Sequence, residues 1–176
     1  MLISFFCRDL WVAGSLCKTG CGSSPTFDAS TSSSFKNQST NFDVTYGSGQ
    51  AVGTIGSDVI QMGGFSVNNQ IFGVCDRVSS GLLTTPVSGL LGLAFEAIAS
   101  SGAMPFWQAL VSNGAWDSPL MAFFLTRFVH SCLGYVEANQ VRRYINATFV
   151  NSEVPGGSFT MGKSSSSSTF HLLIVT

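Results

Sequence analysis

Charged side chains are scarce in this chain of 176 residues, where Asp, Glu, Lys and Arg together make up 10%. Eight basic residues against nine acidic ones give a net charge of -1, so the chain lacks the basic face that nucleic-acid binding needs. No apolar run approaches the length of a membrane span. We therefore expect neither nucleic acid nor membrane as a partner. The length suits one domain with a sizeable core.

The sequence also predicts neither a metal site nor a secretory leader. The two histidines, His130 and His171, lie far from the cysteines and lack ligand spacing, so we expect no metal and no cofactor. The apolar start, residues 1–7, has no basic region before it and is too short for a secretory leader, so we expect no signal peptide in this chain.

Cysteines are present, but in an odd number, namely Cys7, Cys17, Cys21, Cys75 and Cys132. Cys17 and Cys21 can close a small disulfide loop in an oxidising compartment. Three residues separate them, whereas a redox-active C-x-x-C motif has two, so a redox pair is not favoured. Low charge with many Ser, Thr and Gly residues suits a β-rich secreted protein.

Two triplets fit the N-glycosylation pattern, residues 37–39 (NQS) and residues 146–148 (NAT). Such triplets also arise often by chance.

The strand signals are strongest between residues 40 and 95. Residues 46–49 (YGSG) predict a hairpin tip, because β-favouring residues flank glycines that can take positive φ. Residues 64–75 predict another strand pair, with its turn at Asn68-Asn69. Residues 89–95 (GLLGLAF) are small and apolar, with glycines that permit close backbone approach.

The second half of the chain is less regular. Residues 105–111 predict a short helix that begins at a proline and ends before Gly114. Residues 118–126 predict an apolar strand. We assign neither helix nor strand to residues 128–150, and strand signals return at residues 154–162.

Several of these segments, in this order, resemble the N-terminal lobe of pepsin-like aspartic proteases. The matching pieces are residues 10–12 (LWV), the serine-rich turn 27–35 (FDASTSSSF), the flap-like residues 46–49 and the segment 89–94. Residues 154–170 look like the opening of the C-terminal lobe. The resemblance implies a mostly β fold with one β-barrel-like lobe, short helices and a stub of the second lobe.

The resemblance also divides the chain. Residues 1–8 form an unmatched N-terminus, 9–128 the pepsin-like lobe, 129–150 an unmatched insertion and 151–176 a truncated start of the C-terminal lobe. Strand edges that normally meet the other lobe would be exposed, so we expect aggregation through that interface.

The catalytic aspartates that the resemblance implies are absent. The family pattern D-T-G-S-S-x-L-W-V places the first one at Ser4, with residues 5–8 (FFCR) replacing T-G-S-S, and the second falls beyond the chain end. The chemistry needs two carboxylates about 3 Å apart that share one proton, which a serine cannot supply. Ser4 also lacks the G-x-S-x-G context of a serine nucleophile. We therefore predict no catalytic residue.

The other aspartates considered are not followed by Thr-Gly or Ser-Gly, and we expect them at surface turns or strand ends: Asp28, Asp43, Asp58, Asp76 and Asp117.

The substrate-facing residues remain in the sequence. By resemblance, Tyr46 covers a bound peptide while its hydroxyl pairs with the indole N–H of Trp11. Gly47 and Ser48 would offer hydrogen bonds to an extended substrate, and Trp107 would line an apolar pocket. For each aromatic residue the alternative is plain core packing.

The sequence therefore predicts an inactive member of the aspartic endopeptidases, a family that cleaves extended peptides or proteins by a two-aspartate, water-activating mechanism. By resemblance it would be extracellular or vacuolar. The alternatives are a non-catalytic peptide-binding module, or a non-functional fragment from a mispredicted gene model. The unmatched residues 1–8 and 129–148 favour the last of these.

Overall fold

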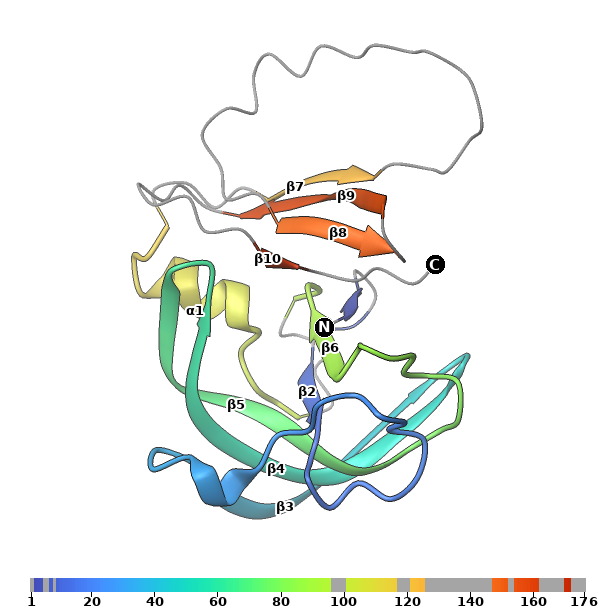
Figure 1. Ribbon diagram of the computed structural model, residues 1–176. Helices are drawn as coiled ribbons and strands as arrows, with labels where there is room; N and C mark the ends of the chain where they lie inside the picture. The colour runs from blue at the N-terminus through green and yellow to red at the C-terminus, as the bar shows by residue number, and fades with distance from the viewer. Residues whose placement is uncertain are drawn as a thin grey trace, which may run out of the picture.

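A computed structural model describes residues 2–4, 7, 9–95, 101–116, 121–125, 147–151, 154–161 and 170–171. Strands predominate in these residues and form two sheets, accompanied by one α-helix and one short 3-10 helix. Figure 1 shows the three longest strands as one curved layer, with the second sheet as a separate layer beyond α1. The predicted mostly β fold class is confirmed.

The larger sheet has six strands in the order β1-β6-β2-β5-β4-β3. Their bounds are β1 Leu2–Ser4, β2 Leu10–Ala13, β3 Lys36–Tyr46, β4 Gly49–Met62, β5 Phe65–Val78 and β6 Gly89–Gly92. Strands β3, β4 and β5 pair antiparallel as a meander. Strand β2 runs parallel to β5 and antiparallel to β6, and β1 runs parallel to β6. Strand β6 therefore lies between β1 and β2, although β1 and β2 follow each other in the sequence.

The first predicted hairpin is confirmed, because Tyr46 pairs with Gly49 across a two-residue turn. The second predicted strand pair is wrong. Residues 65–78 form one continuous strand, and the turn before it lies at Gly63 and Gly64, both with positive φ. Asn69 also has a positive φ of 56°, opposite a shift in the β4–β5 register. Asparagine tolerates this conformation as a single residue, so the Asn pair marks a bulge within a strand.

Apolar side chains fill two clusters, one on each side of β2 and β6. Neighbouring residues on these strands belong to different clusters, since successive side chains point to opposite faces. Leu10 and Leu91 contribute to the cluster beneath the helix, whereas Trp11 and Leu90 contribute to the other. Both faces of the central strands are therefore covered.

The helix α1, Phe106–Ser112, confirms the predicted helix. Pro105 precedes its first residue, and Gly114 follows with a φ of 66°. Phe106 and Leu110, one turn apart, are its buried residues and pack into the first cluster.

The serine-rich turn leads from the N-terminal strands into β3. The side chain of Asp28 accepts from the backbone N–H of Ser30 at 3.0 Å and caps the 3-10 helix η1, Ala29–Thr31. These hydrogen bonds, first from the Ser30 hydroxyl and then from its N–H, lower the pKa of Asp28. The rings of Phe27 and Phe35 meet edge to face with centroids 5.4 Å apart. The two aromatic residues thus bracket the turn as anchors.

Asp58 lies in the middle of β4 with 6% of its surface exposed, so the expectation of a surface turn or strand-end position is wrong for this residue. Its carboxylate accepts hydrogen bonds from the hydroxyls of Ser32, at 2.7 Å, and Ser34, and from the N–H of Val59. Burial acts to raise the pKa of Asp58, but the three hydrogen bonds outweigh it and lower the pKa. The carboxylate fastens the serine-rich turn to β4.

The second sheet has the strand order β10-β8-β9-β7. Its strands are β7 Met121–Leu125, β8 Ala147–Asn151, β9 Val154–Met161 and β10 Phe170–His171. Strands β7 and β9 confirm the two predicted strand regions, and β8 begins inside the stretch to which the sequence assigned no structure. Residues 126–146 lie outside the described part of the chain, as do Cys132 and Asp117.

Candidate functional site

The β3–β4 hairpin presents an exposed tip. Gly47 and Ser48 form its two-residue turn and are exposed, and a Cβ atom at Gly47 would meet nothing within 4 Å. The base of the hairpin is fixed, because Ser79 exchanges hydrogen bonds with the backbone N–H and C=O of Gln50 at 2.9 Å each. The backbone of the tip is therefore exposed, whereas the base of the hairpin is held by hydrogen bonds. An exposed backbone of this kind can pair with an extended peptide.

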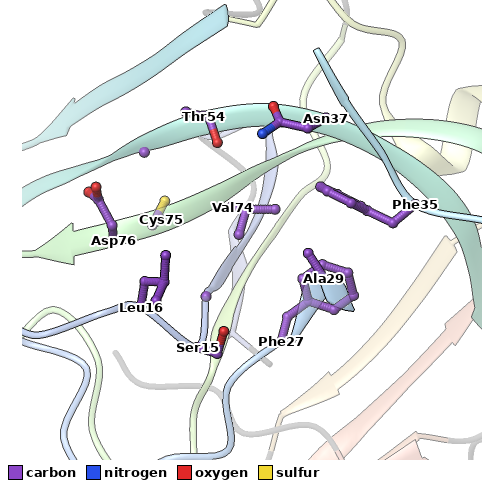
Figure 2. Close-up of a pocket in the computed structure, with 12 residues that line it drawn as sticks. Ser15, Leu16, Phe27, Ala29, Phe35, Asn37, Thr54, Val74, Cys75 and Asp76 are labelled. Carbon is purple, nitrogen blue, oxygen red and sulfur yellow. The ribbon is translucent and has the colours of Figure 1, made fainter. Parts of the chain in front are cut away.

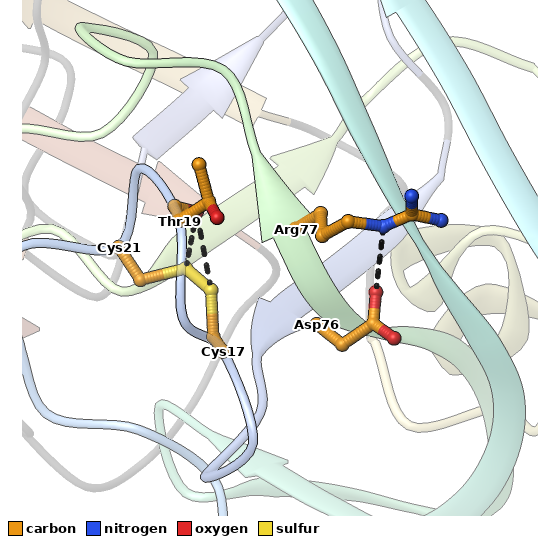
Figure 3. Close-up of a disulfide and its surroundings, with 5 residues drawn as sticks. All are labelled: Cys17, Thr19, Cys21, Asp76 and Arg77. Carbon is orange, nitrogen blue, oxygen red and sulfur yellow. Dashed lines mark hydrogen bonds and ion pairs between the residues drawn. A yellow bond between two sulfur atoms is a disulfide. The ribbon is translucent and has the colours of Figure 1, made fainter.

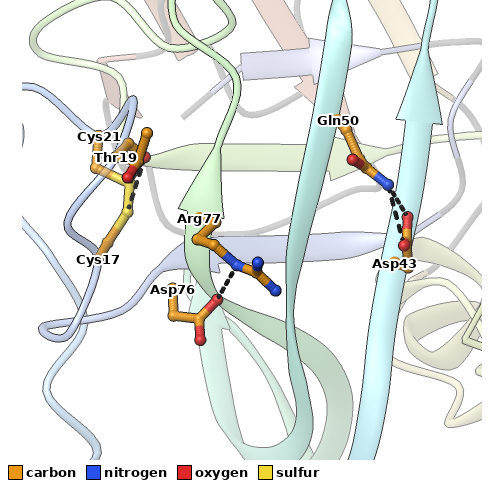
Figure 4. A network of polar contacts seen from close by, with 7 residues as sticks. All are labelled: Cys17, Thr19, Cys21, Asp43, Gln50, Asp76 and Arg77. Atoms are coloured by element: carbon orange, nitrogen blue, oxygen red, sulfur yellow. Dashed lines mark hydrogen bonds and ion pairs between the residues drawn. A yellow bond between two sulfur atoms is a disulfide. The ribbon is translucent and has the colours of Figure 1, made fainter.

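One further polar pair lies across the hairpin. The side-chain amide of Gln50 donates to both carboxylate oxygens of Asp43, at 2.8 and 3.0 Å (Figure 4).

Tyr46 and Trp11 meet behind this tip. Trp11 on β2 is fully buried, and its indole Nε1–H donates to the hydroxyl oxygen of Tyr46 at 2.8 Å. Burial, followed by the nearby Cys7 thiol, raises the pKa of Tyr46 above its usual 10.0, and the Trp11 hydrogen bond opposes this with a smaller effect. The phenol therefore stays neutral and retains its own proton for donation. The structure brings together two of the residues that the sequence singled out, 35 positions apart.

Cys7 and Asp9, between β1 and β2, lie close to this pair. Their backbone is tied to the end of β6 and to the segment after it, because Gly92 N–H donates to Asp9 O at 3.1 Å and Ala94 N–H donates to Cys7 O at 2.9 Å. At the end of β1, the backbone of Ser4 pairs with Gly92.

Close packing of β2 on β6 depends on glycine. A Cβ atom at Gly89 would lie 2.3 Å from the carbonyl oxygen of Trp11, so no larger residue fits there without moving the backbone. The small residues that drew attention in the sequence therefore have a direct steric reason.

Asp9, which immediately precedes β2, is buried, with 4% exposed. Its carboxylate accepts from the backbone N–H of Ser101 at 3.0 Å and from the Ser101 hydroxyl. It thereby links the start of β2 to the segment that leads into α1. Sequence reasoning gave Asp9 no role, because the position is variable in the resembled pattern.

Asp76, on β5, pairs with the adjacent Arg77 at 3.6 Å, and both side chains are exposed (Figures 3 and 4). The five aspartates of the described residues, Asp9, Asp28, Asp43, Asp58 and Asp76, are thus held by different partners: in that order Ser101, Ser30, Gln50, the serine pair of the serine-rich turn, and Arg77. Each has a turn, sheet or surface contact that accounts for its position.

Trp107 belongs to another part of the lobe. It lies on α1, donates from Nε1 to the carbonyl oxygen of Ala94 at 3.3 Å, and meets the ring of Phe95 edge to face at 5.1 Å. It packs against the first hydrophobic cluster, whereas Trp11 and Tyr46 belong to or pack against the second. A role for Trp107 in an apolar substrate pocket stays a prediction.

Cys17 and Cys21 form a disulfide, and both sulfur atoms lie near the carbonyl oxygen of Thr19 (Figure 3). The loop is joined to the end of β5, since Val78 N–H donates to the same Thr19 oxygen at 3.0 Å. Gly20 within it has a φ of 74°, and a Cβ atom there would collide with the Val78 carbonyl. The disulfide loop is thus attached to the sheet at the end of β5.

Two described cysteines lie outside the disulfide, Cys7 and Cys75. Burial, then the neighbouring Asp76 charge, raises the pKa of the Cys75 thiol to about 12, so this thiol stays protonated. Among the described residues no three His, Cys, Asp or Glu side chains gather as a metal site. None of the helices in that part of the chain is long and apolar enough to cross a membrane.

The sequence of this chain is similar to those of known proteins. The model of the family described as "Eukaryotic aspartyl protease" matches residues 7–170. Major aspartyl peptidase 1 of Cryptococcus neoformans is 54% identical over 121 residues, which are 68% of this chain and 25% of that protein. Rhizopuspepsin-4 of Rhizopus niveus is 38% identical, covering 66% of this chain and 30% of its own length. Pepsin A of Sus scrofa is 36% identical, over 67% of this chain and 31% of that protein. The chain spans a quarter to a third of these relatives.

Proposed function

Because this chain belongs to the eukaryotic aspartyl protease family, we propose that it forms the peptide-binding wall of an aspartic endopeptidase and does not itself catalyse cleavage. The observation that carries the proposal is the hydrogen bond from Trp11 to Tyr46 behind an exposed hairpin tip. Such a tip offers backbone hydrogen bonds to an extended peptide, and a neutral phenol adds a donor.

The absence of catalysis follows from the acid–base chemistry. Peptide hydrolysis of this kind needs one carboxylic acid and one carboxylate that share a proton around a water molecule. The sequence contains no Asp-Thr-Gly or Asp-Ser-Gly triplet, and alignment with the resembled family pattern puts Ser4 at the first catalytic position. A serine hydroxyl neither donates nor accepts a proton in that role at ordinary pH.

The substrate class proposed is an extended peptide or unfolded protein. Gly47 and Ser48 at the tip would pair with its backbone, and Tyr46 would close over it. The disulfide between Cys17 and Cys21 supports an oxidising location, extracellular or vacuolar.

For the domains we propose a pepsin-like lobe over residues 9–128, an insertion over 129–150 and the start of a second lobe over 151–176. The long meander and α1 fall within the first range, which supports this division. Limited proteolysis should then leave a resistant fragment that ends close to residue 128. A first cleavage inside β4 or β5 would contradict the division.

The test of function combines a binding and a cleavage assay. The folded chain is titrated with a statine-type peptide inhibitor and then incubated with an unfolded protein at about pH 3–5, where a shared-proton carboxylate dyad is active. We expect binding without cleavage. Tyr46→Ala should weaken binding about tenfold or more, which corresponds to about 1.4 kcal/mol. Thr45→Ala, an exposed neighbour on the same hairpin, should leave binding unchanged.

Two outcomes would contradict the proposal. Cleavage that the inhibitor blocks would show that carboxylates of this chain do assemble a dyad. Equal binding by the Tyr46→Ala and Thr45→Ala variants, or none by a chain that circular dichroism shows to be folded, would remove the hairpin from peptide recognition.

A second candidate is a non-functional product of a mispredicted gene model. It is favoured by residues 5–8 (FFCR), which stand where the resembled pattern has Thr-Gly-Ser-Ser. Sequencing of the transcript decides between the two. A transcript that joins an Asp-Thr-Gly-Ser-Ser codon run to Asp9 would support this candidate, and one that encodes residues 1–8 and 129–148 as written would exclude it.

A further inference from the structure

An open recess lies beside the beginning of β3, away from the contacts that join Tyr46 and Trp11. It encloses about 300 Å³, and its lining includes Phe27, Phe35, Asn37 and Val74 (Figure 2). Phe35 and Asn37 lie two residues apart, so in an extended chain they share one face. The side chain of Asn37 therefore stands at an open space.

The backbone around Asn37 departs from a regular strand. Its Oδ1 atom accepts a hydrogen bond from the N–H of Ser39 at 2.8 Å, and Ser39 has a φ of 54°. The β3–β4 register shifts between Asn37 and Thr40. Residues 37–39 thus form an Asx turn on a bulge, and this turn uses the amide oxygen of Asn37 and not its Nδ2 atom.

The place of Asn37 in the sheet also leaves it accessible from solvent. Strand β3 lies at one of the two edges of the six-stranded sheet, so only one side of it is paired within that sheet. Asn37 is exposed, as are the residues from 36 to 41 around it. A bulky modification at Asn37 would displace no strand and no core residue.

We propose that Asn37 carries an N-linked glycan. The triplet Asn37-Gln38-Ser39 fits the acceptor pattern. The proposal rests on the oxidising, secretory location proposed above, and it is independent of peptide binding by the hairpin.

The transfer itself needs a lipid-diphosphate-linked oligosaccharide as donor and the transferase of the host membrane. The bond from the first sugar's anomeric carbon to the diphosphate oxygen breaks, and that oxygen leaves with the electron pair. A new bond forms from the same carbon to Nδ2 of Asn37, which loses one proton. No oxidant or reductant takes part.

A glycan there would also protect the sheet. Unpaired edge strands are templates for pairing with other chains, and β3 exposes six consecutive residues from Lys36 onward. A branched sugar at Asn37 would hinder another strand from docking along this edge.

The experiment uses the full chain behind a cleavable secretory leader in a eukaryotic host, with cell extract and medium both analysed by peptide mass. All variants carry Asn146→Gln, which removes the second triplet. We expect a glycan on Asn37 that peptide-N-glycosidase removes, converting Asn37 to Asp. Asn37→Gln and Ser39→Gly should abolish it. Glycine suits the positive φ of Ser39, so the latter variant loses the triplet without backbone strain.

Asn41→Gln is the matched control, since Asn41 is exposed on the same strand and begins no acceptor triplet. It should leave the glycan in place. The proposal is overturned if Asn37 emerges unmodified from a chain whose Cys17–Cys21 disulfide has formed, or if Asn37 is unmodified while Asn146 of the otherwise unaltered chain carries sugar. Loss of peptide binding in the earlier assay would not affect this result, because the peptide mass at Asn37 is measured without any bound peptide.

Discussion

Replacing Asp58 with asparagine should loosen the serine-rich turn from β4. The carboxylate, 6% exposed, accepts from the hydroxyls of Ser32 and Ser34 and from the N–H of Val59 at 2.7 Å. Asparagine keeps one acceptor oxygen and places an NH₂ group where the second oxygen was. Hydrogen bonds to charged groups contribute about 1.5–3 kcal/mol each, and a serine hydroxyl can rotate to accept from the new amide. We expect a loss of about 2 kcal/mol at neutral pH, or a Tm lower by about 4–8 °C.

This loss should depend on pH with a definite sign. The pKa of Asp58 is lowered from 3.8 in the folded chain, so its carboxylate stabilises the fold above that value. The contribution disappears as the pH falls from 3.8 through the lower folded pKa, because the native carboxylate then takes up a proton. The difference between the parent chain and Asp58→Asn should therefore be constant near neutrality and shrink below 3.8.

The assay is urea unfolding followed by circular dichroism at a series of pH values. Asp43→Asn is the control, since Asp43 is exposed and its partner Gln50 also lies on the surface. It should change the free energy of unfolding far less. An equal loss for Asp58→Asn at neutral and acid pH, or no loss at neutral pH, would refute the assignment of a stabilising carboxylate.

Three further substitutions test contacts that stabilise the lobe. Tyr46→Phe removes the acceptor for the buried indole N–H of Trp11 and should cost about 1–3 kcal/mol in urea unfolding, so unchanged stability would contradict a buried hydrogen bond there. Gly53→Ala places a Cβ atom 2.0 Å from a carbonyl oxygen of β5. It should abolish soluble expression or lower the free energy of unfolding by more than about 3 kcal/mol. A variant that circular dichroism shows to be well folded would disprove this packing. The double variant Cys17→Ser with Cys21→Ser opens a short loop and should lower the unfolding free energy by about 2 kcal/mol, an expectation that an unaltered Tm would rule out.

Local features of the fold were predictable from the sequence. The hairpin tip at residues 46–49 and the helix near residues 106–112 depend on nearby glycine and proline, whose backbone preferences act within a few residues. The break placed at Asn68-Asn69 failed because asparagine serves a turn and a bulge equally well. Only the facing strand β4, with its register shift, selects the bulge.

The site was predictable in a different way. The contact of Tyr46 with Trp11 came from a family resemblance, since no local pattern connects residues 35 positions apart. Asp58 was misplaced because its burial depends on Ser32 and Ser34, which reach it from a turn more than twenty residues earlier. Contacts between distant segments are the ones that composition and periodicity do not encode.

The position of β6 between β1 and β2 has a consequence for the order of folding. Strand β1 pairs with residues 90–92, so its place in the sheet stays vacant until the whole meander of β3, β4 and β5 has been synthesised. Closing so long a loop costs chain entropy before any contact repays it, and such topologies fold slowly. Strand β1 is therefore among the last parts of the lobe to be fixed in place. While β3 to β6 are being synthesised, a chain emerging from the ribosome would expose the unpaired sides of β2. We therefore expect chaperones to bind the N-terminal strands during synthesis.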